Sequence, residues 1–129
     1  GVRIAAGENA CTAFEFKKMM RSGAVSFAQP SVTKVGGITE FRKISVLAEV
    51  FGTQIMPHSP YFGPGFLATL HLAQSIASPG WIERIFIEPE AALYPKEIFD
   101  PVGGSFKVPN GIGLGFEPDL DVVKSYRLN

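Results

Sequence analysis

The sequence predicts an α/β fold in which helices alternate with the strands of a parallel sheet. The first observation is a set of short apolar runs, several with β-branched residues, at positions 2–6, 25–28, 54–56 and 85–87. The second is that the longer segments between these runs carry apolar residues at steps of three and four, as amphipathic helices do. Such alternation of strand and helix along a chain is typical of a parallel sheet.

Composition and charge predict one domain and exclude two kinds of partner. With 129 residues and 46% hydrophobic content, the chain can bury a single core. Twelve basic and twelve acidic residues give a net charge of zero, so no overall field attracts nucleic acid or an anionic membrane surface. No stretch approaches the roughly 18 apolar residues of a membrane span. The single Cys11 excludes an internal disulfide and fits a reducing compartment. We therefore expect a cytoplasmic protein.

Three helices are expected after the first three strands. Thr12 and Glu15 have the spacing of a capping box at the start of the first helix, and Gly23 is placed to end it. The second helix is expected to end at Gly52, and the third to begin after residues 63–65. The apolar stripes that should face the core are Phe41, Ile44, Leu47, Ala48 and Phe51 in the second helix, and Phe66, Leu70, Ala73 and Ile76 in the third.

The chain beyond Glu88 has no such periodicity. Its prolines and glycines predict an irregular segment, with a hairpin-like stretch over residues 105–116 around Pro109. A short helix is expected over about residues 119–126.

Polar residues stand at or near the ends of the predicted strands. Glu8, Ser31 and His58 follow the first three strands, and Glu83 lies in the fourth apolar segment. The carboxyl ends of parallel strands are where α/β folds place their chemistry. We therefore expect these four side chains to form the functional site.

Five motifs spread along the chain carry a resemblance to a known family. They are, in order, AAGEN, QPSVTKVGGITEFRKISVLAEVFG, IMPHS, WIER and VPNGIGLGFEPD. In order and spacing they resemble the last part of the barrel domain of the enolase superfamily, in the branch of mandelate racemase and muconate lactonizing enzyme. The resemblance covers essentially the whole chain. It implies a (β/α) barrel enzyme of the TIM type that binds magnesium and removes the proton α to a substrate carboxylate.

The resemblance also implies which part of the barrel this is. A full barrel takes roughly 250 residues, so the chain corresponds to about strands five to eight with their helices. Residues 1–88 are expected to form this partial barrel, and residues 89–129 a C-terminal segment that packs on it within the same domain. The other metal ligands, the lysines of an earlier strand and a capping domain are expected to precede residue 1.

The roles of individual residues follow from the same resemblance. Glu8 matches one of three carboxylates that hold Mg²⁺, an ion that prefers oxygen ligands in an octahedral array. His58 matches the acid–base histidine of the family. An imidazole with an ordinary pKa of about 6.5 suits this role, because it exchanges protons near neutral pH. Ser31 stands where the family has an aspartate that orients this histidine. Glu83 matches the acid that hydrogen-bonds the substrate carboxylate, and Lys34 is a candidate cation near Glu8.

Each assignment has a structural alternative. Glu8 could instead be a carboxylate at the N-terminus of the first helix. His58 could be a loop histidine, and Lys34 a solvated loop lysine. Glu83 could pair only with Arg84 or face the solvent.

Ser31 also affects the expected reaction. A hydroxyl does not stabilise an imidazolium as a carboxylate does, so racemisation, which needs matched bases on both faces, is less favoured than dehydration of an acid sugar. The alternatives are a racemase or cycloisomerase, and a non-catalytic half-barrel that as an isolated chain is inactive. We expect a small carboxylate substrate, and either a homo-oligomer or association with the missing barrel half.

Overall fold

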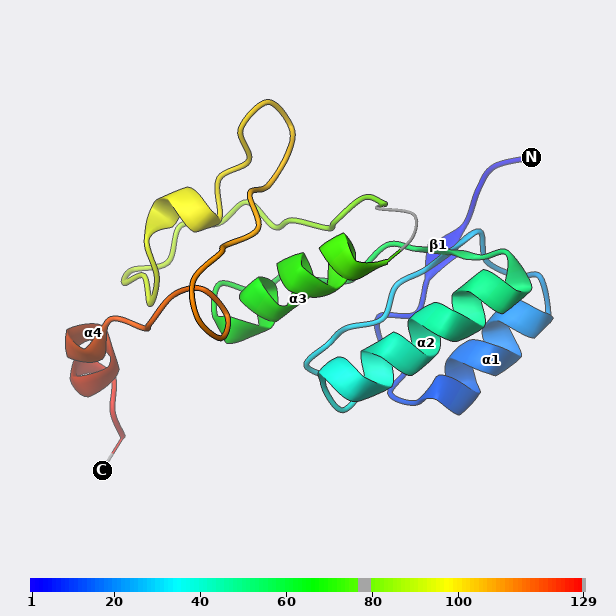
Figure 1. Cartoon of the computed structure of the whole chain (residues 1–129), viewed down its shortest axis with the longest axis horizontal. Coiled ribbons are helices and arrows are strands. Elements are labelled where there is room, and N and C mark those ends of the chain that lie inside the picture. Colours follow the sequence, from blue (N-terminus) through cyan, green and yellow to red (C-terminus); the bar gives the residue numbers. More distant parts are fainter. Residues whose placement is uncertain (77–79, 129) are drawn as a thin grey trace.

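The computed structural model describes residues 1–76 and 80–128, which alternate between strands and helices as the sequence predicts (Figure 1). The elements in chain order are β1 (Ala5–Ala6), α1 (Ala13–Arg21), β2 (Phe27–Ala28), α2 (Ile38–Phe51), β3 (Gln54–Ile55), α3 (Pro64–Ser75), the 3-10 helix η1 (Lys96–Ile98) and α4 (Leu120–Ser125).

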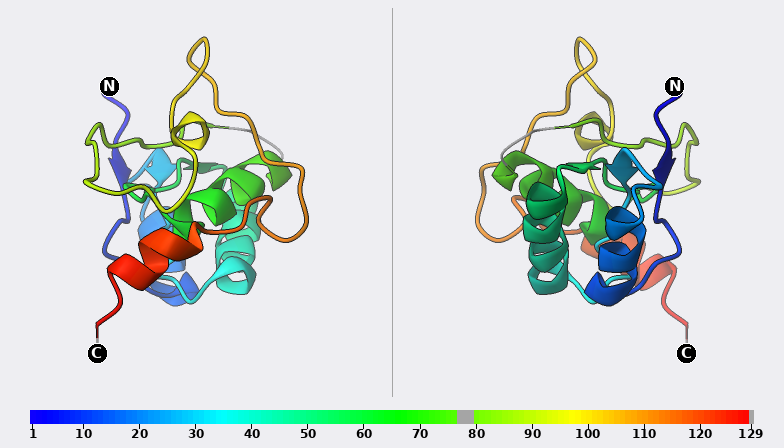
Figure 2. Two further views of the ribbon diagram at one scale, coloured as in Figure 1. Left: turned by 90° about the vertical axis from the view of Figure 1, so that its left-hand side faces the viewer. Right: turned by 90° about the vertical axis from the view of Figure 1, so that its right-hand side faces the viewer.

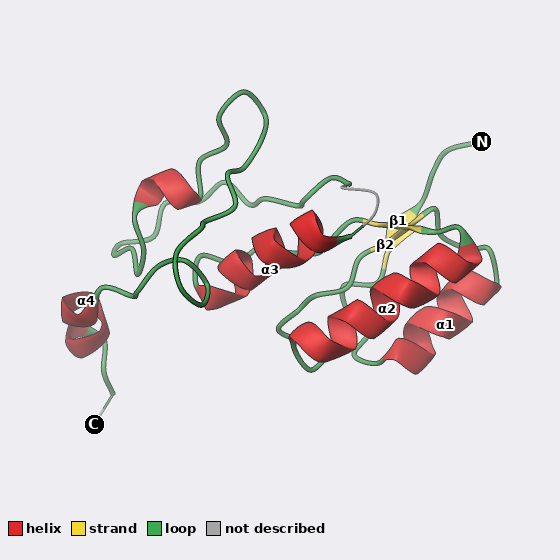
Figure 3. Cartoon of the chain, viewed as in Figure 1, coloured by secondary structure: helices red, strands yellow, loops and turns green. Residues whose placement is uncertain are grey.

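The three strands form one parallel sheet in the order β1-β2-β3. Figure 3 labels β1 and β2 of this sheet. Ala5 pairs with Phe27 across the first two strands, and Phe27 pairs with Gln54 across the next two. Each strand is shorter than its predicted run, but the backbone pairing continues past the strand ends. The amide of Met56 donates to the Ala28 carbonyl at 2.9 Å, and the amide of His58 donates to the Pro30 carbonyl at 3.2 Å.

Helices α1 and α2 lie side by side and pack against the sheet (Figures 1 and 2). The predicted capping box is confirmed, because Thr12 Oγ1 accepts from the Glu15 amide while the Glu15 carboxylate accepts from the Thr12 amide. Of the expected stripe in α2, Phe51 at the end of the helix is 36% exposed. The first core cluster is made of Ala10, Phe16, Met20, Ala28, Val32, Val35, Phe41, Ile44, Ala48, Ile55, Ala68 and Leu72.

Helix α3 joins this core to a second one. One side of it contributes Ala68 and Leu72 to the first cluster. The rest of the helix packs against the C-terminal segment in a cluster made of Phe66, Leu67, Leu70, Tyr94, Ile98 and Phe99. The segment after residue 88 therefore packs against α3, although it holds few regular elements.

Two predicted elements are absent. Residues 80–89 contain no strand, so the expected fourth strand at 85–87 is wrong; Phe86 and Ile87 are exposed, so no core drives the pairing of this run. The expected hairpin at 105–116 is also wrong. The antiparallel contact is a single bridge between Val102 and Ser105, where Gly103 has a φ of 59° that favours glycine.

The last predicted helix is confirmed. Helix α4 begins after Asp119, whose carboxylate accepts from the amides of Asp121 and Val122. In the part of the chain that the structure describes, no helix has the length and apolar composition needed to cross a membrane.

Candidate functional site

Three of the four predicted site residues lie at the same edge of the sheet. Glu8, Ser31 and His58 follow β1, β2 and β3 by two or three residues. Since the strands are parallel and paired in this order, their carboxyl ends meet along one edge. The sequence prediction of a shared edge is correct for these three residues.

Backbone hydrogen bonds bring the fourth residue to the same place. The amide of Glu83 donates to the Pro57 carbonyl at 3.3 Å, and the buried Ser59 hydroxyl donates to the Glu83 carbonyl at 2.7 Å. The His58 amide points towards β2, because it donates to the Pro30 carbonyl. In an extended chain the backbone groups of neighbouring residues point to opposite sides, so the Pro57 carbonyl points away from β2. Glu83 therefore occupies the position beside β3 that faces away from β2, although no strand forms there.

His58 and Glu83 form a side-chain pair at this edge. His58 Nδ1 lies 2.6 Å from Glu83 Oε2, and the two side chains are 13% and 41% exposed. The Tyr61 ring meets the His58 ring edge-on, with centroids 6.2 Å apart. The alternative in which Glu83 pairs with Arg84 is not what the structure shows, because Arg84 Nε donates to the Phe99 carbonyl.

Ser31 forms no side-chain hydrogen bond with His58. Its hydroxyl is fully buried and forms hydrogen bonds with the Tyr61 hydroxyl and, at 3.2 Å, with Thr33 Oγ1. Gly65 at the start of α3 allows this arrangement, because a Cβ there would lie 2.6 Å from the Thr33 methyl group. The Ser31 hydroxyl, which stands where the family has an aspartate, is thus engaged by Tyr61 and Thr33, and its catalytic role stays a prediction.

Tyr61 is the site residue that the sequence analysis missed. It lies in the loop between β3 and α3, where the pattern of polar residues at strand ends makes no prediction. Its position three residues after His58 is the one signal that could have identified it.

Glu8 lies in an exposed turn directly after β1. The amide of Ala10 closes this turn on the Gly7 carbonyl at 3.0 Å. Lys34 Nζ donates to the carbonyl oxygen of Glu8 at 3.1 Å and to Asn9 Oδ1 at 3.4 Å. Lys34 therefore reaches Glu8 across neighbouring strands, but it binds the main chain.

The Glu8 carboxylate is not used to cap the first helix. Glu15 fills that role, since its Oε2 accepts from the amides of Cys11 and Thr12, each at 3.0 Å. Among the described residues, the Glu8 carboxylate has no hydrogen-bond partner and remains free to bind a ligand.

The described residues fit part of a magnesium site. A carboxylate oxygen is the type of ligand that Mg²⁺ prefers, and Glu8 presents one at the strand edge. Residues 1–76 and 80–128 contain no group of three His, Cys, Asp or Glu side chains that could hold a metal ion. A single carboxylate of this kind would fill one position of an octahedral shell.

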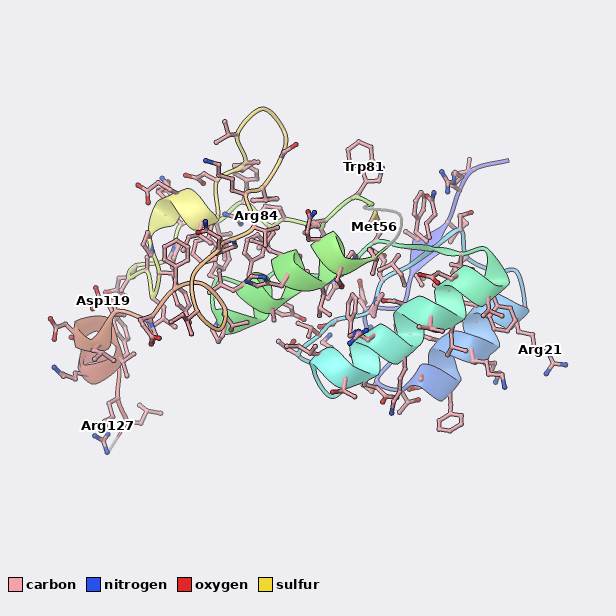
Figure 4. The ribbon with its side chains drawn as sticks, in the orientation of Figure 1. Arg21, Met56, Trp81, Arg84, Asp119 and Arg127 are labelled. Atoms are coloured by element: carbon pink, nitrogen blue, oxygen red, sulfur yellow. The ribbon has the colours of Figure 1, made fainter. Side chains whose placement is uncertain are left out.

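A separate cavity of about 890 Å³ lies next to this edge. It is lined mainly by residues 84–101 together with Phe62 and does not include His58 or Glu83. Arg84, labelled in Figure 4, lies at its wall with its guanidinium 4.7 Å from the centroid of the Phe62 ring, and its Nη1 atom is buried without a hydrogen-bond partner among the described residues.

Known proteins similar to this chain share its sequence and its fold. A family model described as enolase C-terminal domain-like matches residues 1–122. The arabinonate dehydratase of Saccharolobus solfataricus is 35% identical over 127 residues, which cover 98% of this chain and 34% of that protein. The chain thus spans about a third of the length of this curated relative.

Two solved structures support the same relationship. A mandelate racemase/muconate lactonizing enzyme from Sulfitobacter sp. superposes with a TM-score of 0.83 at 35% identity, over 97% of this chain and 31% of that one. An L-talarate dehydratase from Polaromonas sp. JS666, complexed with Mg and L-glucarate, superposes with a TM-score of 0.56 at 34% identity, over 64% of this chain and 21% of that one. The three-stranded parallel sheet, its helices and these matches lead to one conclusion: the chain belongs to the enolase C-terminal domain-like family.

Proposed function

We propose that this chain is part of a magnesium-dependent enzyme that removes water from an acid sugar. The observation that carries the proposal is the hydrogen-bonded pair of His58 and Glu83 at the strand edge that also presents Glu8. Two relatives with more than 30% identity are dehydratases by name, and both names refer to sugar acids. We propose that the chain forms the C-terminal portion of a (β/α) barrel, and that its segment after residue 88 completes the same domain.

The proposed reaction requires one proton to leave a carbon and one hydroxyl to leave its neighbour. The C–H bond α to the carboxylate breaks, its electron pair forms a carbon–carbon double bond, and the β hydroxyl leaves with a proton as water. The enol that remains rearranges to a 2-keto acid. His58 is the group in this chain that can give a proton to the departing hydroxyl or take one from the α carbon.

Glu8 is the residue of this chain that would bind the metal ion. When bound, Mg²⁺ supplies positive charge beside the substrate carboxylate, which lowers the cost of removing the α proton. The contacts of Lys34 with Glu8 and Asn9 hold the turn that presents the Glu8 carboxylate. The remaining ligands would come from outside this chain, since one carboxylate does not fill the shell.

A racemase or cycloisomerase is the second candidate. It is supported by the name of the Sulfitobacter relative, which is 35% identical over nearly the whole chain. Against a racemase stands the serine at position 31, whose hydroxyl is engaged by Tyr61. Dehydration can be served by one acid–base group that takes the α proton and gives a proton to the leaving hydroxyl, and we propose His58 for this role.

We further propose that the open edge of the sheet is covered by another strand. Within the described part of the chain, β1 is paired on one side only, with β2. Val2 and Ile4, which lead into β1, are 89% and 51% exposed. An unpaired edge with exposed apolar residues is a surface for association. As an isolated chain, the half-barrel is expected to be inactive and to pair with the rest of the barrel or with a second copy.

The test is an assay of the full natural polypeptide with a panel of sugar acids. Arabinonate, L-talarate and L-glucarate are incubated with the purified protein, with and without Mg²⁺, and formation of the 2-keto acid is measured. We expect product that requires Mg²⁺ and is abolished in His58→Asn. His71→Asn is the matched control, because His71 lies on α3 and its Nε2 contacts only the Leu114 carbonyl among the described polar groups. Turnover in His58→Asn at the wild-type rate would overturn the proposal.

A further inference from the structure

We infer that Glu83 is the residue that positions His58, in the place of a partner at position 31. The contact that carries the inference is the 2.6 Å distance between His58 Nδ1 and Glu83 Oε2. The inference rests on the proposed function for its catalytic meaning, but the pair itself is a property of this chain and can be measured without turnover.

The backbone fixes the Glu83 side chain beside the imidazole. Glu83 is held through its amide by the Pro57 carbonyl and through its carbonyl by the Ser59 hydroxyl. Pro57 and Ser59 are the two neighbours of His58, and both are buried. The main chain at position 83 is thus tied to the residues on either side of the histidine, and its side chain meets the ring between them.

The side chain at position 31 does not orient the histidine. The Ser31 hydroxyl is fully buried and is occupied by Tyr61 and Thr33. The Tyr61 ring in turn lies edge-on to His58 at 6.2 Å between centroids. Glu83 is therefore the one charged group that contacts the His58 ring among the described residues.

This geometry selects one tautomer of His58. A carboxylate oxygen only accepts hydrogen bonds, so Nδ1 carries the proton that it donates to Glu83. Nε2 then holds the free lone pair and can take a proton from the substrate; once protonated, it can give a proton to a departing hydroxyl. The negative charge of Glu83 stabilises the imidazolium formed between these two events.

The role of Glu83 in the site changes accordingly. A carboxylate that accepts from His58 does not donate a hydrogen bond to a second carboxylate. The substrate carboxylate must then be bound by other groups, and Glu83 acts through the histidine as a positioning residue.

His71 provides an internal reference for the test. Its Nε2 lies 3.2 Å from the Leu114 carbonyl oxygen, which can only accept, so Nε2 carries the proton. The two histidines of the chain are thus expected to be opposite tautomers when neutral: Nδ1–H for His58 and Nε2–H for His71.

The experiment is ¹⁵N NMR of the imidazole nitrogens in the purified protein, with the His58 signals assigned by their loss in His58→Asn. We expect the Nδ1–H pattern for His58 and the Nε2–H pattern for His71. Glu83→Leu removes the acceptor while leaving both backbone bonds in place, and it should replace the His58 pattern by a mixture of tautomers. Glu90→Gln, a change of an exposed glutamate in the same segment, is the matched control and should leave both patterns unchanged. An Nε2–H pattern for His58 in the wild type would overturn the inference.

A kinetic measurement separates this inference from the proposed function. Glu83→Gln, which keeps the size of the side chain and removes its charge, should lower kcat about 10- to 100-fold with a smaller change in KM, as loss of an orienting partner does. If acid-sugar turnover is present but unchanged in Glu83→Gln, the positioning role is wrong and the proposed function stands. If the His58 tautomer depends on Glu83 but no sugar acid is turned over, the pair stands and the proposed function is wrong.

Discussion

The Nζ atom of Lys34 lies 3.1 Å from the carbonyl oxygen of Glu8, so that the loop after β2 is tied to the turn after β1. A second contact, to Asn9 Oδ1 at 3.4 Å, holds the same turn. The lysine therefore fixes the main chain that presents Glu8 and leaves the Glu8 carboxylate available.

Lys34→Met should loosen this turn with a small loss of stability. The bond is exposed, so we expect the free energy of unfolding to fall by about 1 kcal/mol or less. Urea unfolding of the variant measures the change. Lys107→Met is the matched control, since Lys107 is exposed and has no hydrogen-bond partner among the described residues. Equal effects of the two substitutions would show that the contacts of Lys34 do not stabilise the turn.

Glu8→Gln should weaken the binding of magnesium in the proposed enzyme. An amide carries no charge and is a poorer ligand for Mg²⁺ than a carboxylate. Loss of a residue that hydrogen-bonds a metal ligand typically lowers metal affinity about 10-fold or more, and loss of the ligand itself should lower it further. The Mg²⁺ concentration for half-maximal activity should therefore rise more than about 10-fold. Titration of activity with Mg²⁺ tests this, with Glu90→Gln as the control; an unchanged requirement would remove Glu8 from the metal site.

Ser31 and Tyr61 should depend on each other energetically. Their hydroxyls share a hydrogen bond, and the Ser31 side chain is fully buried. We expect Ser31→Ala and Tyr61→Phe each to lower the free energy of unfolding by about 1 kcal/mol. The double variant should lower the free energy of unfolding by less than the sum of the two single changes, because both single changes remove the same hydrogen bond. A double-mutant cycle by denaturant unfolding measures the coupling, and additive costs would contradict it.

Gly7 should tolerate no side chain. Its φ is 130°, and a Cβ at this position would lie 2.7 Å from the Phe16 ring and 3.2 Å from the Gln29 amide nitrogen. Gly7→Ala therefore adds backbone strain to a steric clash, and we expect a loss of about 2 to 4 kcal/mol in stability. Gly23→Ala is the matched control, because Gly23 has a φ of 68° but a Cβ added there would meet nothing within 4 Å. It should cost about 1 to 2 kcal/mol, from strain alone. Equal costs would show that the clash with Phe16 is relieved by a shift of the ring.

The capping box should make stability depend on pH in the acid range. The hydrogen bond from Thr12 is the main cause that holds the pKa of Glu15 below its ordinary value of 4.5, with a further bond from the Cys11 amide. Because the lower pKa belongs to the folded state, the stabilisation is complete above the ordinary value and is lost as the pH falls through the folded pKa. Glu15→Gln should flatten this part of the profile of unfolding free energy against pH. Glu49→Gln, on the exposed face of α2, should retain it.

The sequence was sufficient to predict the helices and strands whose apolar residues recur at a regular spacing. The alternation of strands and helices and the shared edge of Glu8, Ser31 and His58 follow from the pattern of a parallel sheet. The contacts between side chains from different loops do not. The contact between Tyr61 and Ser31 joins residues 30 apart in the chain, and that between Glu83 and His58 joins residues 25 apart.

In the fourth segment, Glu83 lies beside His58 although the strand predicted there does not form. The apolar run of this segment predicts a strand at 85–87, but the backbone bonds that fix the segment are made at Glu83, with residues on either side of His58. These bonds use a serine hydroxyl and the carbonyl of a proline, and neither is visible in the period of apolar residues. The position of Glu83 could therefore be anticipated from strand order, but its partner could not.

The backbone anchoring of Glu83 has a consequence for how such proteins diverge. Since the amide and the carbonyl of this residue fix its place, the main chain stays where it is whatever side chain it carries. A single codon change there exchanges the group that faces the histidine at little cost to folding. Substitutions at position 83 can therefore change the proton-transfer chemistry of His58 while the fold stays the same.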